Sequence, residues 1–139
     1  MSPLLAAALL TAATALVWHS AWGYWRGAAS FERQRGVYRT LARRRWVHET
    51  IPRTLPVTAV SGTLLSMAAW GRVWLAAHPD AALRGPVLAA AVVSLTLAFL
   101  VLVAFVPSLL LYNAPAFLVA PHDRGRPGGL ALRRRYSGR

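Results

Sequence analysis

Three long apolar segments dominate the pattern of hydrophobic and polar residues along the chain. Residues 3–25 and 86–112 contain no Asp, Glu, Lys or Arg, and residues 55–77 contain only Arg72. Each segment is at least as long as the roughly 20 residues that a helix needs to cross the hydrocarbon core of a bilayer. The pattern therefore predicts an all-α, single-domain integral membrane protein over residues 1–139, with three transmembrane helices.

Local signals mark where these helices begin and end. Ser2 before Pro3 is a favourable helix start, and Thr54 is the expected cap of the second helix. Pro107 is expected to kink the third helix, which should end at residues 113–115. Arg72 falls near the far end of the second helix, where we expect it to extend to the membrane surface between tryptophans.

A cleaved signal peptide is the alternative interpretation of residues 3–25. No basic residue precedes this segment, and bulky residues such as Trp22 and Trp25 stand where a cleavage site needs small ones. A retained helix is the favoured interpretation.

The loops predict how the helices are arranged. Only residues 78–85 separate the second and third segments, so these two helices should form an antiparallel hairpin, whereas the longer link at 26–53 constrains the first helix less. Residues 113–139 are expected to form an interfacial segment and a basic cytoplasmic tail. Together with the link they hold fourteen of the sixteen arginines. Positively charged loops stay in the cytoplasm, so the N-terminus is expected outside and the C-terminus inside.

Composition supports a membrane protein and argues against nucleic-acid binding. The chain is 56% hydrophobic and 14% charged, whereas soluble domains are about 45–50% apolar and about 25% charged. The net charge of +12 could indicate a nucleic-acid partner, but the sorting of arginines to one membrane side explains it. All sixteen basic residues are arginine, which is typical of GC-rich bacterial genomes, so the expected location is a bacterial plasma membrane.

The link is predicted to include a basic amphipathic helix that rests on the inner membrane surface. An imperfect apolar stripe between Phe31 and Trp46 would face the membrane, and anionic headgroups are the expected partners of the neighbouring arginines. These lipid-facing basic candidates are Arg33, Arg39, Arg43 and Arg44. The simpler interpretation, a loop whose charges only set the topology, is favoured. The glycine-rich tail from residue 122 onward is expected to be largely disordered.

Catalytic, cofactor and metal sites are not expected. The chain has no cysteine, no carboxylate within the apolar segments, and no nucleotide-binding or hydrolase motif. His19, His48 and His122 fall toward the same membrane side, but their spacing matches no ligand pattern. Whether these histidines come together is left open.

Small residues at four-residue spacing are candidates for close helix packing. We expect Gly62 and Ser66 of the second helix to meet small residues of the third helix inside the hairpin. Those partners are Ala90, Ser94 and Ala98.

The leading functional hypothesis is a non-catalytic accessory or scaffold subunit of a membrane complex, whose partner is another membrane protein or a second copy. One alternative is a homo-oligomeric channel or carrier. Such a pore should depend on the polar residues of the apolar segments, which are Thr11, Ser61, Ser66, Ser94 and Thr96. Another alternative is a sensor of anionic lipids that uses residues 31–46.

Overall fold

The computed structural model describes residues 2–27, 49–79 and 82–137, and these residues form helices joined by turns. The α-helices are α1 (Pro3–Arg26), α4 (Leu55–Ala77), α5 (Arg84–Tyr112) and α6 (Gly129–Ser137). Short 3-10 helices are η1 (Ile51–Thr54), η2 (Ala116–Leu118) and η3 (Pro121–Asp123). The expected all-α class is confirmed, and the three long helices differ from the predicted ranges by at most two residues at each end.

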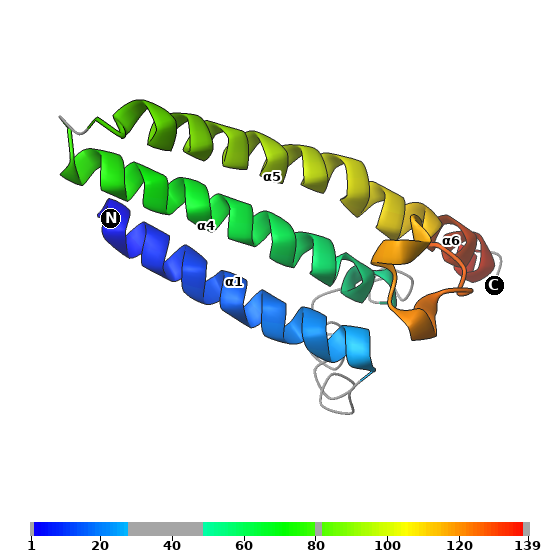
Figure 1. Ribbon diagram of the computed structural model, residues 1–139. Coiled ribbons are helices and arrows are strands. Elements are labelled where there is room, and N and C mark those ends of the chain that lie inside the picture. The colour runs from blue at the N-terminus through cyan, green and yellow to red at the C-terminus, as the bar shows by residue number, and fades with distance from the viewer. Residues whose placement is uncertain (1, 28–48, 80–81, 138–139) are drawn as a thin grey trace.

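The three long helices lie side by side, with α4 between α1 and α5 (Figure 1). The short turn after Ala77 returns the chain beside α4, so α4 and α5 form the predicted antiparallel hairpin. The α1 helix packs on the other side of α4 and also runs antiparallel to it. This arrangement gives α4 two helical neighbours.

The expected cap of α1 is confirmed, and that of α4 is wrong. The Ser2 hydroxyl accepts a hydrogen bond from the Leu5 amide at 3.3 Å, and Gly27 ends α1 in the left-handed conformation. The Thr54 side chain makes no capping bond and donates instead to the Ile51 carbonyl. The reason is that η1 leads directly into α4, so the backbone at Thr54 is already helical and cannot adopt the extended conformation of a cap.

The α5 helix continues through Pro107 and ends at Tyr112. Asn113 follows in the left-handed conformation, with φ of 58°, and Pro115 comes two residues later. Asparagine tolerates this conformation better than most residues. The predicted end at residues 113–115 is therefore confirmed.

The expectation of a disordered tail is wrong for residues 122–137, which fold against the end of α5. The Asn113 side-chain amide donates to the carbonyls of Asp123 and Arg126 at 3.0 and 2.9 Å. Leu132 of α6 is 5% exposed. These contacts could not be predicted from the composition of the tail, because the few residues that become buried are scattered among glycines and arginines.

Two clusters of buried apolar residues lie near the end of the bundle where α1 and α5 end and α4 begins. One cluster joins α1 and α4 through residues that include Tyr24 and Leu55, and a second joins α4 and α5 through Val57 and Leu109. Residues 113–137, which follow α5, are called the C-terminal segment, and Val119 and Ala120 of this segment belong to these clusters. The C-terminal segment therefore covers the end of the three-helix layer.

A testable consequence concerns Gly128, where the C-terminal segment passes close to α5. A Cβ atom here would overlap the Leu111 carbonyl oxygen and lie 2.7 Å from the Tyr112 carbonyl carbon. Because these are backbone atoms, Gly128→Ala should cost about 1–3 kcal/mol and loosen α6. Trypsin should then cleave faster at residues 133–135. Gly85→Ala is the control, since nothing lies within 4 Å of a Cβ there; equal cleavage rates in both variants would contradict this contact.

Candidate functional site

A buried ion cluster, consisting of Tyr24, Arg53, Asp123 and Arg126, joins three distant parts of the chain. The Tyr24 hydroxyl donates to Asp123 Oδ2 at 2.7 Å, and Arg53 Nε lies 3.7 Å from the same oxygen. Arg126 Nη1 lies 3.0 Å from Asp123 Oδ1. Arg53 and Asp123 are 2% and 1% exposed, whereas Arg126 is 55% exposed. The cluster is therefore a buried carboxylate faced by one buried and one exposed guanidinium.

Local structure explains how these side chains meet. The last turn of α1 presents Tyr24, η1 presents Arg53 immediately before α4, and η3 ends at Asp123. Arg53 Nη1 also donates to the Pro127 carbonyl at 3.0 Å, which holds the chain that leads to α6. Since a buried charge is costly unless it is paired, each partner here depends on the others.

The contacts of the buried ion cluster link the segments that contribute to it. The Asp123 carboxylate accepts a hydrogen bond from the Tyr24 hydroxyl, and two arginines balance its charge. The His122 ring packs edge-on against the Tyr24 ring, with centroids 5.3 Å apart. Within the described ranges, no three His, Cys, Asp or Glu side chains are close enough to hold a metal ion. His48 lies outside these ranges, so the question about the three histidines stays open.

A second polar contact zone joins α1 to α4 inside the apolar layer. The Thr14 and Ser66 hydroxyls are 3.2 Å apart and both residues are buried. Two indole groups add hydrogen bonds at the exposed surface between the same two helices: Trp18 of α1 donates to Thr63, and Trp70 of α4 donates to Thr11, each at 2.9 Å. Such bonds between membrane helices contribute about 0.6–2 kcal/mol each.

The predicted partner of Gly62 and Ser66 is wrong. A Cβ at Gly62 would lie 2.8 Å from the Thr14 hydroxyl, and Ser66 is hydrogen-bonded to the same residue. Both therefore face α1 rather than α5. Their four-residue spacing places them on one face of α4, but α4 has two neighbours, and the spacing does not indicate which neighbour that face meets.

The remaining packing candidates have different environments. Ser94 and Ala98 are buried, at 7% and 0% exposure, whereas Ala90 is exposed. A close approach of α4 to α5 occurs at Gly71, where a Cβ would lie 3.2 Å from the Ala91 methyl group. Gly71 was not among the predicted packing residues, although it is a small residue between Trp70 and Arg72.

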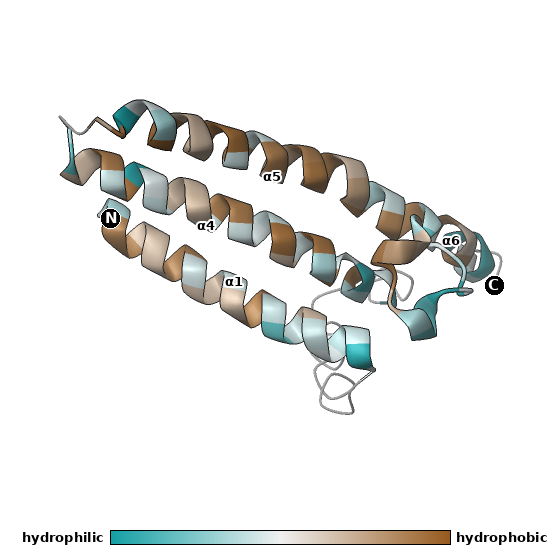
Figure 2. Cartoon of the chain, in the orientation of Figure 1, coloured by the Kyte–Doolittle hydropathy of each residue, from teal (hydrophilic) through white to brown (hydrophobic). Residues whose placement is uncertain are grey.

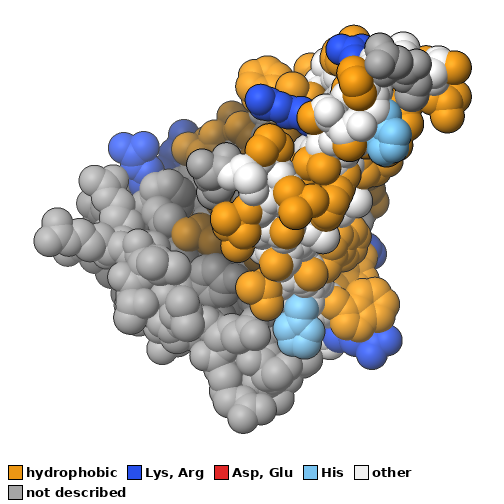
Figure 3. Space-filling view, turned by 90° about the vertical axis from the view of Figure 1, so that its left-hand side faces the viewer, with side chains coloured by type: hydrophobic (Ala, Val, Ile, Leu, Met, Phe, Trp, Pro, Cys, Tyr) orange, Lys and Arg blue, Asp and Glu red, His pale blue; other side chains and the backbone are white. Residues whose placement is uncertain are grey.

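Apolar residues recur along all three long helices (Figure 2), and many of their large side chains are exposed on the outside of the helical layer (Figure 3). The α1 and α5 helices are long and apolar enough to cross a membrane, yet only 17% and 11% of their most apolar stretches are buried. A core helix of a soluble protein would be mostly buried, and water disfavours such a large apolar surface. The two helices therefore indicate membrane insertion.

The described arginines gather at one end of the bundle. Arg72 and Arg84 lie toward the end where α4 turns into α5. The opposite end carries Arg26, Arg53, Arg124, Arg126, Arg133, Arg134 and Arg135. The four lipid-facing candidates of the link, Arg33, Arg39, Arg43 and Arg44, lie outside the described residues.

Comparison with known proteins gives no relative: no protein-family model matches the chain, and no curated protein or solved structure matches it significantly.

Proposed function

We propose that this chain is a non-catalytic membrane protein with three transmembrane helices, α1, α4 and α5, which acts as an accessory or scaffold subunit of a membrane complex. The observation that carries the proposal is the combination of an exposed apolar exterior with polar side chains bonded between α1 and α4, through the buried Thr14–Ser66 pair and two exposed tryptophan bonds. In a bilayer, polar groups need partners within the protein, whereas apolar groups can face lipid.

The α4 helix is the third proposed span, although its hydroxyl groups and Arg72 make it less apolar than its neighbours. It lies between α1 and α5 and contacts both, so it would lie at the same depth in the membrane as these two helices. Its 23 residues span about 34 Å, enough for the hydrocarbon core. The hydroxyls of Thr58, Thr63 and Ser66 donate to carbonyls one turn earlier.

The proposed orientation places the arginine-rich end in the cytoplasm of a bacterial cell. The buried ion cluster lies at this end and holds α1, η1 and the C-terminal segment together. Exposed arginines of α6 would then lie near the anionic inner surface of the membrane.

The contacts of the polar residues favour a scaffold over a channel or carrier. Thr11 and Ser66 take part in contacts between α1 and α4, and Thr96 donates to the Val92 carbonyl of its own helix. Three of the five polar residues on which a pore should depend thus have partners within one chain. Ser61 is buried without a hydrogen-bond partner in the described chain, but a single hydroxyl does not form a pathway.

In-membrane photocrosslinking tests the proposed role. A crosslinking amino acid replaces Phe99, which is 64% exposed on α5, and the control carries it at Ala82 in the exposed turn. We expect a stoichiometric foreign membrane protein to be captured from position 99 and not from position 82. Capture of the same chain alone would contradict the accessory role and favour a homo-oligomer.

A further inference from the structure

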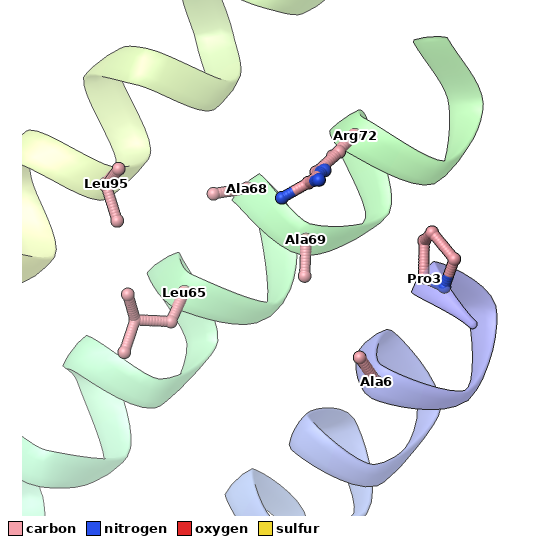
Figure 4. Close-up of a pocket in the computed structure, with 7 residues that line it drawn as sticks. All are labelled: Pro3, Ala6, Leu65, Ala68, Ala69, Arg72 and Leu95. Carbon is pink, nitrogen blue, oxygen red and sulfur yellow. The ribbon is translucent and has the colours of Figure 1, made fainter. Parts of the chain in front are cut away.

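A groove runs along one face of α4 between α1 and α5. Near the arginine-poor end it encloses about 410 Å³, and α4 supplies Leu65, Ala68, Ala69 and Arg72 to its lining (Figure 4). Pro3 and Ala6 of α1 and Leu95 of α5 form the sides. Leu65 also lines the next hollow of about 210 Å³, which extends to Thr58. From Thr58 to Arg72 the α4 axis rises about 21 Å, more than one leaflet of hydrocarbon.

Arg72 is the one charged group in the lining of this groove. In Figure 4 its side chain lies back along α4 toward Ala68, rather than toward the end of the helix. This direction differs from the expected extension to the membrane surface between tryptophans. Within the described chain, Arg72 has no ion pair or side-chain hydrogen bond. Arg72 is exposed at the surface of the groove. A guanidinium beside leucine and alanine side chains in a membrane is costly unless it reaches water or headgroups or is paired, and an anionic group would neutralise its charge.

We propose that this groove binds one anionic phospholipid of the outer leaflet. The lipid phosphate would accept hydrogen bonds from Arg72, since guanidinium and phosphate form strong charge-assisted pairs. One acyl chain would lie along Leu65 and the alanines toward the middle of the bilayer. This inference rests on the proposed membrane topology, which places the backbone of Arg72 about 7.5 Å along the axis from the outer end of α4. The guanidinium, which lies back toward Ala68, is deeper than the backbone and has to turn toward the surface to reach the phosphate.

A second copy of the chain is a less suitable occupant. The α1, α4 and α5 helices contain no Asp or Glu, so none of them can supply a carboxylate to Arg72. A free inorganic anion would satisfy the guanidinium but leave the apolar groove unfilled. A phospholipid matches both the charge and the apolar lining.

Native mass spectrometry of the full chain in mild detergent tests the site. Phosphatidylglycerol and phosphatidylcholine with identical acyl chains are the probes. We expect one phosphatidylglycerol to bind at a concentration about tenfold lower than phosphatidylcholine requires. Arg72→Gln should remove this preference. Arg84→Gln is the matched control, because Arg84 is an exposed arginine near the same end that donates to the Pro79 carbonyl.

A second variant tests the groove itself. Ala68→Phe should fill the groove and weaken binding of both lipids, while circular dichroism confirms that the helices are retained. Equal binding of the two lipids to the wild type, equal losses in Arg72→Gln and Arg84→Gln, or a lipid-free dimer would each overturn the proposal. The membrane orientation of the same variants separates the two proposals. If they insert with the predicted orientation, only the lipid site is wrong, whereas the reversed orientation would contradict the proposed topology.

Discussion

Replacing Asp123 by alanine should lower the free energy of unfolding by about 3–5 kcal/mol, the usual cost of removing one partner from a buried ion pair. The substitution leaves the buried Arg53 guanidinium without its carboxylate and removes the acceptor of the Tyr24 hydroxyl. Because Asp123 joins the C-terminal segment to α1 and η1, residues 121–137 should also become sensitive to protease. Denaturant unfolding in mild detergent measures the first effect, and limited trypsin digestion measures the second.

The control for this prediction is Glu49→Gln. Glu49 accepts a hydrogen bond from Tyr136 at 3.0 Å, is only partly buried, and forms no ion pair within the described chain. Glutamine can still accept that bond, so a change below about 0.5 kcal/mol is expected. Replacing Arg53 and Asp123 together by methionine and leucine should be less harmful than Asp123→Ala, because no unpaired charge remains buried. Equal stability of Asp123→Ala and Glu49→Gln would contradict the role of the cluster.

Replacing Gly62 by leucine should separate α1 from α4 and cost about 1–3 kcal/mol through overpacking. Even a Cβ atom at this position would lie 2.8 Å from the Thr14 hydroxyl, and a leucine adds three more carbons. The displaced helix would also weaken the hydrogen bonds from Trp18 and Trp70. Thermal unfolding in detergent measures the loss.

A paired substitution identifies the neighbour of Gly62. Thr14→Ala removes the atoms nearest to the added Cβ, so Gly62→Ala should be less destabilising in the Thr14→Ala background than in the wild type. Ala98→Gly on α5 serves as the unrelated background. If Ala98→Gly relieved Gly62→Ala and Thr14→Ala did not, the close contact would lie in the hairpin after all.

Helix positions could be predicted from the sequence because the apolar runs are long and are bounded by clear signals. The predicted range 55–77 coincides with the bounds of α4, and the predicted cap of α1, Ser2, is the cap in the structure. These features depend on neighbouring residues alone. The hairpin followed from the short turn between α4 and α5, which leaves those helices no other arrangement.

Features that depend on distant residues could not be predicted in the same way. The contact between Asp123 and Arg53 could not be predicted, because nothing near either residue in the sequence indicates that two side chains seventy residues apart would meet. The face of α4 that carries Gly62 was assigned to the wrong neighbour for the same reason. The folding of the tail depends on Asn113 and Gly128, two positions whose role appears only when the end of α5 is beside them.

The central claim is that three helices cross the membrane with the arginine-rich end inside, and the absence of cysteine makes this directly measurable. Single cysteines replace Arg26, Ala82 and Ala131, three exposed positions at the ends of the described helices. In intact cells, a membrane-impermeant maleimide should label only position 82, and positions 26 and 131 should react after permeabilisation. Labelling of positions 82 and 26 from the same side would show that α4 does not span the membrane and would contradict the account.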